Sequence, residues 1–429
     1  MTAKNLFLLL TFFFFSCKKE MEIFDLGVII PIDSISVSDP LVPSFSFPCL
    51  AGYAGDYPCK GYDLIGHLSL KNLETTMAND SWGWTDKETG KEYALVGVYE
   101  GTAFVDISKP DNPIYLGRLP SASFQSDWRD IKVYKDYAFI VSEAKEHGLQ
   151  IFNLKNLRDL RDLKSPIEYK STNLFKSIGA AHNLFINENS GYAYILGSRK
   201  LNGLGKGGPI FINISDPENP IWEGGYEANE YVHDAQIVTY KGPDNDYFGR
   251  EIYVGSHGSQ SSENNVVILD VTEKKSPKLI SSFTYPNSGY AHQGYFSEDH
   301  RYFFLGDELD EINYGGLTKT FIFDFKDLDN PNLSFINSGK YKAIDHNGYI
   351  KENLFYMANY TAGVRVYDIT NVGNKIIEEI GFFDTYPKNN DTAFEGAWNV
   401  YPFFESKNII ISDINSGLFI IKSNKLLVN

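Results

Sequence analysis

The chain has 429 residues, of which 43% are hydrophobic and 15% aromatic, and this is enough for a large packed core. Its formal net charge is −16, and the acidic residues are spread along the chain rather than gathered in a tail. Nucleic acids and anionic lipid surfaces select basic patches, so this balance argues against nucleic acid as a partner and favours an acidic, solvated surface.

The N-terminus has the pattern of an export signal. Lys4 precedes the apolar run "LFLLLTFFFF" (6–15), which has the length of a secretory h-region and is too short to span a bilayer. A small residue and then Cys17 close the run, as at a bacterial lipoprotein cleavage site. We therefore expect residues 1–16 to be a signal peptide and Cys17 to be lipidated. An ordinary signal peptide with an incidental cysteine is the alternative.

The expected location follows from that signal. Lys18, rather than Asp, follows the cysteine, which is compatible with sorting to the outer membrane. We expect an exported protein that meets the membrane only through its lipid anchor and faces the periplasm or the medium. Residues 17–48 are rich in Ser and Pro and are predicted to be a spacer.

Cys49 and Cys59 flank a short Gly-rich loop. In an exported protein this pair predicts a local disulfide. A metal site built on the two cysteines is the weaker alternative, because no histidine or second cysteine pair lies at ligand spacing.

A repeat dominates the chain after residue 80. Each copy has an apolar run and then a strand-like segment, which in six copies closes on a β-branched or aromatic residue plus Asp or Asn. In most copies a turn such as "SKPDNP" and a short strand follow. Alternating apolar residues separated by Pro, Asn, Gly, Asp and Ser predict strands and turns rather than helices. Each copy therefore predicts four antiparallel strands. The diagnostic segments are "GTAFVDI" (101), "HGLQIFNL" (147), "GGPIFINI" (207), "NNVVILDV" (264), "TKTFIFDF" (318), "AGVRVYDI" (362) and "SGLFIIK" (416).

The phase of the repeat predicts an all-β fold, a seven-bladed β-propeller over residues 49–424. The residues placed before each first strand are spaced by 45, 53, 51, 59, 54 and 52 residues, in the range of propeller blades. A pair of β-sandwiches does not explain this phasing. The residues are Trp84, Arg129, His182, His233, His292, His346 and Trp398.

The two ends of the repeat are expected to meet. The seventh copy has only three strands, and "YDLIGHLSL" (62–70) matches the missing fourth. An N-terminal strand in that place closes the ring and covers two edges that would otherwise pair with other chains. His67 then lies in an outer strand, where we expect a structural role.

Several motifs resemble the choice-of-anchor B family, whose repeats are of the LVIVD type. The resemblance runs from about Cys49 to Ile421 and implies a propeller at the cell envelope, with no established activity. Members attach to the cell by different devices, and since the sequence shows no C-terminal sorting helix, Cys17 is the expected anchor. The motifs are "CLAGYAGDYPCKGYDL", "HDAQIVTYKGPD", "AHQGYFSEDHRYFFLGDELDE", "GAWNVYPFF" and the repeated P-x-x-P turns.

Polar residues recur where the first strand of each blade starts and where the second ends. Antiparallel pairing brings these two places to one mouth of the central channel. Four of the eight histidines fall in a single register of the repeat. The strand-one residues are Trp84-Thr85, Arg129-Asp130, His182-Asn183, His233-Asp234, His292-Gln293, His346-Asn347 and Trp398-Asn399, and the strand-two residues are Glu143, His257, Asp307, Glu308, Asn359 and Asp413.

Metal binding is the first of three hypotheses for this mouth. Neutral imidazoles are common ligands for Zn, Cu and Fe, and a neighbouring carboxylate often orients them. Four-histidine iron centres on propeller axes occur in carotenoid-cleaving oxygenases, an analogy of fold only. A metalloenzyme would use the ion as a Lewis acid or redox centre. The expected ligands of one divalent transition metal are His182, His233, His292 and His346, with Asp234, Asp345, Asp307 or Glu308 behind them.

A pocket without metal is the second hypothesis, and it makes the protein a binding module for a small ligand or an envelope protein. Arg129 offers a planar donor fork for an anion, and tryptophans offer stacking faces for a sugar. The candidate ligand-binding residues are Trp84, Arg129, Asp130, Asn183, Asp234, Gln293, Asp307, Glu308, Asn347 and Trp398.

A structural role is the third hypothesis: a repeated histidine can fasten neighbouring blades through buried hydrogen bonds. Three blades lack the histidine, so fastening does not require it.

Other motifs are weaker. No serine lies in a G-x-S-x-G elbow, and "LNGLGKGGPI" (201–210) lacks the strand–loop–helix context of a phosphate cradle. "DELDE" (307–311) lacks the ligand spacing and glycine of a calcium loop. His147 and His300 fall in predicted turns, where we expect them to be solvated.

Overall fold

The computed structural model describes residues 46–158, 160, 165–198, 207–227, 231–258 and 264–424. These residues belong to the second of two compact units, Pro43–Asn429. The predicted signal peptide, Cys17, most of the predicted spacer and most of the 201–210 loop lie outside the described residues. In the described part of the chain, no helix has the length and apolar character needed to cross a membrane.

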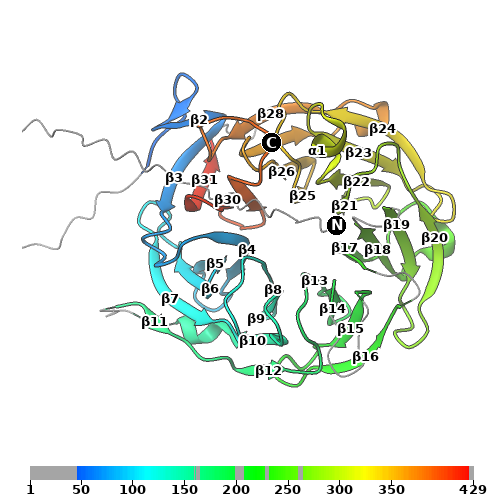
Figure 1. Ribbon diagram of the computed structural model, residues 1–429, viewed down its shortest axis with the longest axis horizontal. Coiled ribbons are helices and arrows are strands. Elements are labelled where there is room, and N and C mark those ends of the chain that lie inside the picture. The colour runs from blue at the N-terminus through cyan, green and yellow to red at the C-terminus, as the bar shows by residue number, and fades with distance from the viewer. Residues whose placement is uncertain are drawn as a thin grey trace, which may run out of the picture. The chain divides into compact units, whose positions relative to one another are not determined.

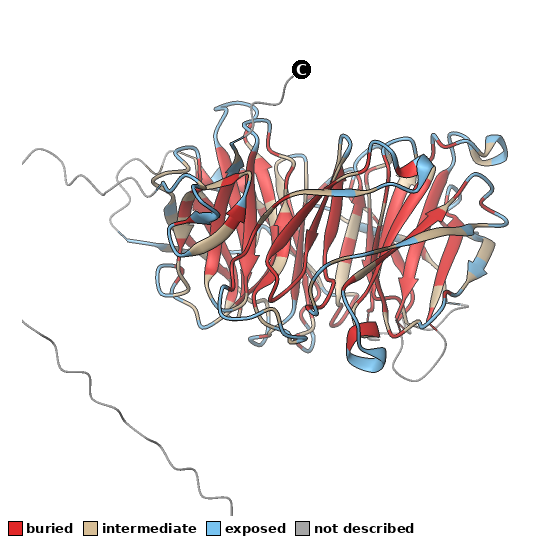
Figure 2. Cartoon of the chain, turned by 90° about the horizontal axis from the view of Figure 1, so that it is seen from above, coloured by how far each residue is buried: buried red, intermediate tan, exposed pale blue. Residues whose placement is uncertain are grey.

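The chain forms an all-β propeller, as predicted. Seven antiparallel sheets form a ring, with the first strand of each blade nearest the centre (Figure 1). The middle strands are buried on both faces, which is why "EYALVGV" is apolar nearly throughout. Seven apolar clusters are found in the described residues, one between each pair of neighbouring blades. Figure 2 shows the buried strands with exposed loops at both ends.

The blades follow one another in chain order. Blades 1 and 2 contain β4 (Ala78–Thr85), β5 (Glu92–Val98), β6 (Gly101–Asp106) and β7 (Ile114–Pro120), then β8 (Arg129–Tyr134), β9 (Tyr137–Ser142), β10 (Leu149–Asn153) and β12 (Asn173–Phe175). Blades 3 and 4 contain β13 (Asn183–Asn187), β14 (Tyr192–Leu196), β15 (Ile210–Asn213) and β16 (Ile221–Gly225), then β17 (Asp234–Thr239), β18 (Glu251–His257), β19 (Asn265–Asp270) and β20 (Lys278–Phe283).

The remaining blades complete the ring. Blades 5 and 6 contain β21 (Ala291–Phe296), β22 (Tyr302–Asp307), β23 (Lys319–Asp324) and β24 (Asn332–Ser338), then β25 (Gly348–Lys351), β26 (Leu354–Ala358), β27 (Val364–Asp368) and β28 (Glu378–Phe383). Blade 7 contains β29 (Ala397–Tyr401), β30 (Asn408–Asp413), β31 (Gly417–Ser423) and β3 (Tyr62–Leu68).

The N-terminal strand closes the ring, as predicted. β3 pairs antiparallel with β31, with Leu64 opposite Ile421 and Leu68 opposite Leu418. The register shifts between Leu64 and Gly66. At Gly66 a Cβ atom would lie 2.0 Å from the carbonyl oxygen of Pro110, so the close approach of the next blade requires glycine there.

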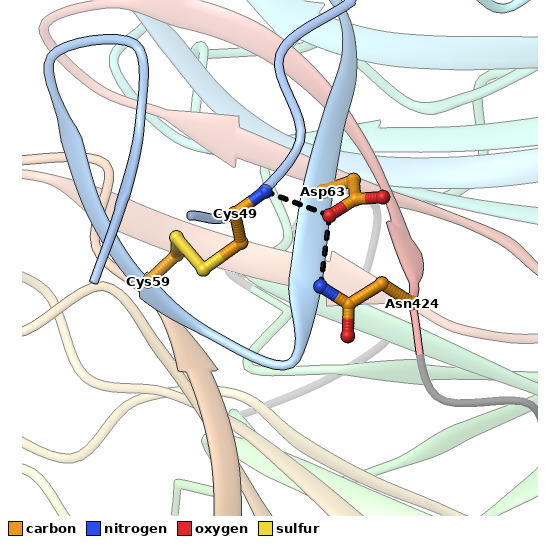
Figure 3. Close-up of a disulfide and its surroundings, with 4 residues drawn as sticks. All are labelled: Cys49, Cys59, Asp63 and Asn424. Atoms are coloured by element: carbon orange, nitrogen blue, oxygen red, sulfur yellow. Dashed lines mark hydrogen bonds between the residues drawn. A yellow bond between two sulfur atoms is a disulfide. The ribbon is translucent and has the colours of Figure 1, made fainter. Parts of the chain in front are cut away.

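The predicted disulfide between Cys49 and Cys59 is confirmed, with the two Cα atoms 6.0 Å apart (Figure 3). It ties the segment before the hairpin β1 (Tyr53–Ala54) and β2 (Tyr57–Lys60) to β2, which pairs with β28 of blade 6. Asp63 of β3 accepts hydrogen bonds from Cys49 N at 2.8 Å and Asn424 Nδ2 at 2.9 Å. The disulfide therefore anchors the start of the closing strand.

Two additions to the four-strand blades were not predicted. The β1–β2 hairpin extends blade 6, and β11 (Ile167–Glu168) pairs in parallel with β7 of blade 1. β11 lies in the long connection between β10 and β12, where the repeat pattern is interrupted. Such an edge addition covers the outer strand of a neighbouring blade.

The predicted position of Trp84 at the channel mouth is wrong. β4 begins at Ala78, and Trp84 lies near its far end, 3% exposed and stacked on Tyr93 with ring centroids 5.0 Å apart. Asp80 Oδ2 accepts from Ile131 N just as Asp130 Oδ2 accepts from Leu184 N, so Asn79-Asp80 occupy the blade 1 position. Asn79 and Arg129 are 50 residues apart, which restores an even spacing.

Candidate metal centre

Four histidines stand side by side around the channel. His182, His233, His292 and His346 lie at or just before the start of the inner strands of blades 3 to 6, each within two residues of the first strand residue. Their ring centroids are 4.3, 4.1 and 4.4 Å apart in that order. We call these four residues the histidine row. The ring brings together side chains that are about 50 residues apart in the sequence, because each blade repeats the same strand position.

Backbone carbonyls orient the rings. His233 Nδ1 donates to His292 O at 2.9 Å, and His346 Nδ1 donates to Trp398 O. The His292 ring likewise lies next to the backbone carbonyl of His346, but its Nδ1 atom makes no hydrogen bond of normal geometry. A carbonyl oxygen only accepts, so Nδ1 of His233 and His346 carries the proton, and Nε2 of a neutral ring keeps its lone pair. The same bonds fasten neighbouring blades.

Glu308 lies opposite the Nε2 atoms. Its Oε2 is 3.6 Å from His292 Nε2, and its Oε1 is 3.7 Å from His346 Nε2. His233, His292 and Glu308 each offer a ligand atom within 4.8 Å of the other two. In the described part of the chain one other group meets this distance, the largely exposed Asp244, Asp327 and Asp329. Imidazole nitrogens with one carboxylate are a donor set for transition metals.

Burial sets the protonation of this group. Desolvation lowers the pKa of His233 and His292 well below the usual range, and that of His346 to about 3. Desolvation also raises the pKa of Glu308 to about 7, although the Tyr360 hydroxyl donates to its Oε1 at 2.8 Å. The imidazoles are therefore neutral at pH 7, the form that binds metal.

His182 stands at the end of the row. Its Nδ1 lies 2.9 Å from Glu143 Oε1, and its side chain is partly exposed. It does not belong to the group of three ligand atoms, and neither does His346. The predicted set of four histidines is thus contiguous in space, but the atoms that converge come from two of them and from Glu308.

A pocket of about 560 Å³ opens over the row, and we call it the mouth pocket. His182, His233 and Glu308 line it, with Trp398 beside them. Glu143, predicted at the end of its strand, also lines the pocket. The remaining lining side chains are mostly aromatic or aliphatic and were not predicted. The sequence carries one signal for them, a tyrosine two residues before the histidine in blades 4 and 5. The aromatic residues are Trp128, Tyr231, Tyr290, Tyr360, Phe394 and Trp398.

The polar residues one position further along the strands join the blades. Asp130 Oδ2 accepts from Leu184 N at 2.7 Å, and Gln293 Oε1 accepts from Gly348 N at 3.0 Å. Asn183 Nδ2 donates to His233 O at 3.0 Å. These contacts lie between neighbouring blades.

Three further candidates occupy different places. Asn183 and Asn347 line a small cavity together with Arg129 and the histidine row itself. Asp234 Oδ1 accepts from Ala235 N at 2.6 Å, and burial, followed by the nearby Asp130, raises the pKa of Asp234 to about 7.

Asp307 holds the surrounding loops. Its carboxylate accepts from the Tyr285 hydroxyl at 2.6 Å and from four backbone N–H groups. The four are those of Gly289, Tyr290, Leu309 and Asp310. Asp307 therefore supports the segment that carries Glu308.

Arg129 is almost fully buried beside the row. Its Nη1 lies 3.2 Å from His147 Nε2, while Nε and Nη2 have no protein partner among the described residues. The expectation that His147 is solvated is wrong: it is 0% exposed, and its Nδ1 donates to Gly148 O at 2.9 Å. His147 lies in the connection between β9 and β10, and its contact with Arg129 buries it, which sequence periodicity does not reveal.

Comparisons with known proteins show the fold. U3-55K has a TM-score of 0.52 at 10% identity, covering 86% of this chain and 99% of that one. A protein from Lactobacillus plantarum has 0.50 at 14%, covering 78% and 88%. A putative 6-phosphogluconolactonase from Bacteroides uniformis has 0.50 at 11%, covering 73% and 86%. What the chain shares with them is the propeller fold.

Sequence comparisons add no family. No protein-family model matches the chain, and no curated protein matches it. They therefore give no support to the choice-of-anchor B resemblance.

Proposed function

We propose that this protein is a binding module of the bacterial cell envelope that holds a small ligand in the mouth pocket beside a divalent transition metal. The observation that carries the proposal is the convergence of His233, His292 and Glu308 within 4.8 Å, with His233 and Glu308 lining the pocket. A propeller fold is compatible with such a binding role.

The donor set fits a transition metal. The Nδ1 hydrogen bond of His233 leaves its Nε2 lone pair free, and blade-to-blade bonds hold the rings in place before an ion arrives. Without a cation, Nε2 lone pairs and a carboxylate face one another, which is an unfavourable arrangement in a buried site. Nitrogen and carboxylate donors suit Zn, Cu or Fe.

A metalloenzyme is the second candidate, and one observation favours it. The protein supplies three converging ligands, and catalytic metal sites keep a position open for water or substrate. The bound ion would act there as a Lewis acid or redox centre. The binding module and the metalloenzyme both require the metal. They differ in whether the bound ligand is released unchanged or is chemically converted.

Elemental analysis of the full chain tests the metal. We expect about one transition metal per chain, and at least a roughly tenfold lower affinity in His233→Ala and Glu308→Gln, since each removes a ligand. Asp329→Asn, in the exposed acidic group, is the matched control and should keep the metal.

Two outcomes would count against the metal. A wild-type chain that retains no Zn, Cu or Fe after reconstitution contradicts it, and ligand binding without metal would point to the metal-free pocket. Metal content that falls as much in Asp329→Asn as in His233→Ala would place the ion elsewhere.

The envelope location and family are part of the same proposal. The apolar run 6–15 followed by Cys17 supports lipidation and an outer-membrane anchor, and a disulfide is typical of an exported protein. The quoted motifs support membership of the choice-of-anchor B family. Metabolic labelling with palmitate should mark the wild-type protein and not Cys17→Ser; equal labelling would contradict the anchor.

A further inference from the structure

A second pocket lies at the other end of the inner strands. It has a volume of about 430 Å³, none of its described lining residues also lines the mouth pocket, and we call it the far pocket. The histidine row lies where the inner strands start, whereas Asn187, Thr239 and Tyr401 of the far pocket are the last residues of β13, β17 and β29. Since the inner strands of successive blades run in the same direction, the two pockets lie at opposite mouths of the channel.

Half-buried aromatic side chains line the far pocket. Trp82 and Tyr401 have ring centroids 5.0 Å apart at 66°, and Tyr401 and Phe403 have centroids 5.3 Å apart at 76°. Because these rings meet edge to face instead of stacking, ring surface is left uncovered in a concave place. An apolar face of a ligand that covers this surface would remove it from water. The aromatic residues are Trp82, Phe185, Tyr295, Tyr401 and Phe403.

Polar groups with fixed orientation lie between the rings. His300, expected in a solvated turn, is half-buried here, and its Nδ1 accepts from Lys241 N at 3.0 Å. Burial, and then the charge of Lys241, lower the pKa of His300 to about 4, so the ring is neutral and donates from Nε2. Gln236 Oε1 accepts from Phe296 N at 2.7 Å, which fixes the orientation of its amide group. The far pocket therefore offers hydrogen-bonding groups beside aromatic faces.

The charges around the far pocket are balanced. Lys132, 8% exposed, donates to Asp130 Oδ1 and lies 3.8 Å from Asp80 Oδ2. Its positive charge is therefore compensated within the protein. At the rim, the exposed Glu188 and Lys241 carry opposite charges. Such a lining does not select strongly for an anion or a cation, which favours an uncharged ligand.

We propose that the far pocket binds a neutral carbohydrate. A sugar ring has apolar C–H faces that stack on aromatic side chains, and hydroxyl groups at its edge that exchange hydrogen bonds with amides, carboxylates and imidazoles. The aromatic lining, together with Gln236, Glu188 and His300, matches both features. A purely apolar ligand would take these polar groups out of water without giving them partners. The volume of the far pocket lies in the range of small-molecule sites, about 300–1,000 Å³.

The far pocket is independent of the candidate metal centre. His233, His292 and Glu308 lie at the start of the inner strands or after the second strand, and none of them lines the far pocket. Carbohydrate binding therefore does not require the transition metal. The protein would carry two separate ligand sites, one at each mouth of the channel.

Saturation-transfer difference NMR of the full chain tests the proposal with four neutral disaccharides: cellobiose, maltose, lactose and chitobiose. We expect transfer to at least one of them, strongest at the C–H protons that face the aromatic rings. Phe403→Ala removes one stacking face and should weaken that binding roughly fivefold. Phe394→Ala, which truncates an aromatic residue of the mouth pocket, is the matched control and should bind the sugar as the wild type does.

Several results would overturn the carbohydrate site. Absence of transfer to all four disaccharides would do so, as would unchanged binding in Phe403→Ala or an equal loss in Phe394→Ala. Tighter binding of glucuronate than of glucose would overturn the neutral class of ligand. If Phe403→Ala does not fold, Phe185→Ala takes its place with the same expectation. His233→Ala should keep sugar binding, which separates this site from the transition-metal proposal.

Discussion

Arg129 and His147 show what burial does to single residues of this propeller. A guanidinium lies next to an imidazole that accepts from it, and neither is exposed to water. Burial, and then the positive charge of Arg129, lower the pKa of His147 to about 3, and burial lowers that of Arg129 to about 10. The histidine is therefore neutral in the folded protein over the whole physiological range.

His147 should make the protein less stable in acid. Its pKa is lower in the folded state than the usual value near 6.5, so the unfolded chain binds a proton first as the pH falls. The free energy of unfolding then drops between pH 6.5 and 3, by up to about 1.4 kcal/mol per pH unit from this residue. Glutamine keeps an acceptor for Arg129 but does not titrate.

Urea denaturation of the wild type and of the His147→Gln variant at several pH values tests whether acid lowers the free energy of unfolding in this way. Between pH 6.5 and 5 the wild type should lose about 2 kcal/mol more than the variant. Other groups, such as Glu308 with its raised pKa, titrate in both chains and cancel in the comparison. Parallel pH curves for the two proteins would contradict a buried neutral His147.

Bulges decide how the inner strands present their side chains. The register of β21 against β22 shifts between Ala291 and Gln293, and that of β29 against β30 between Ala397 and Asn399. His292 lies at the first of these bulges. A bulge re-aims a side chain at a channel mouth, and it is not visible in a period-two pattern. β4 is bulged between Ala78 and Ser81, and there the sequence misplaced the strand start at Trp84.

The closing strand should be required for a monomer. Deleting residues 46–70 removes β3 and leaves the edge of β31 unpaired, so we expect aggregation or dimers and a loss of cooperative unfolding. Size-exclusion chromatography with light scattering measures this.

The paired substitution Cys49→Ser/Cys59→Ser is the control for that deletion. It removes the disulfide but keeps β3, so the chain should stay monomeric and lose roughly 2–3 kcal/mol of stability, because the closed loop is short. A monomeric, cooperatively unfolding deletion variant would show that β3 is dispensable.

At the scale of the whole molecule, the repeat explains the fold. Each copy must bury both faces of its sheet, and neighbouring copies supply the other half of each core. Seven copies with strands from both ends close a ring, and this was predictable from spacing alone. The common register of the histidine row was predictable in the same way, because a repeated strand position recurs at the same depth.

The lining of the mouth pocket was harder to foresee. Phe394 and Trp128 of the mouth pocket lie in connections between strands, outside the repeated register.

The order of residues along the chain was sufficient for the propeller, its closure, the disulfide and the histidine row. These depend on strand periodicity, on blade spacing and on cysteines close in sequence. Tertiary structure decided that Glu308 faces the imidazoles while Asp307 accepts hydrogen bonds from the loops. It also decided that His233 donates its blade-to-blade hydrogen bond from Nδ1 rather than from Nε2. Periodicity places a residue at a depth in the ring, but neighbouring blades and burial determine the direction and charge of its side chain.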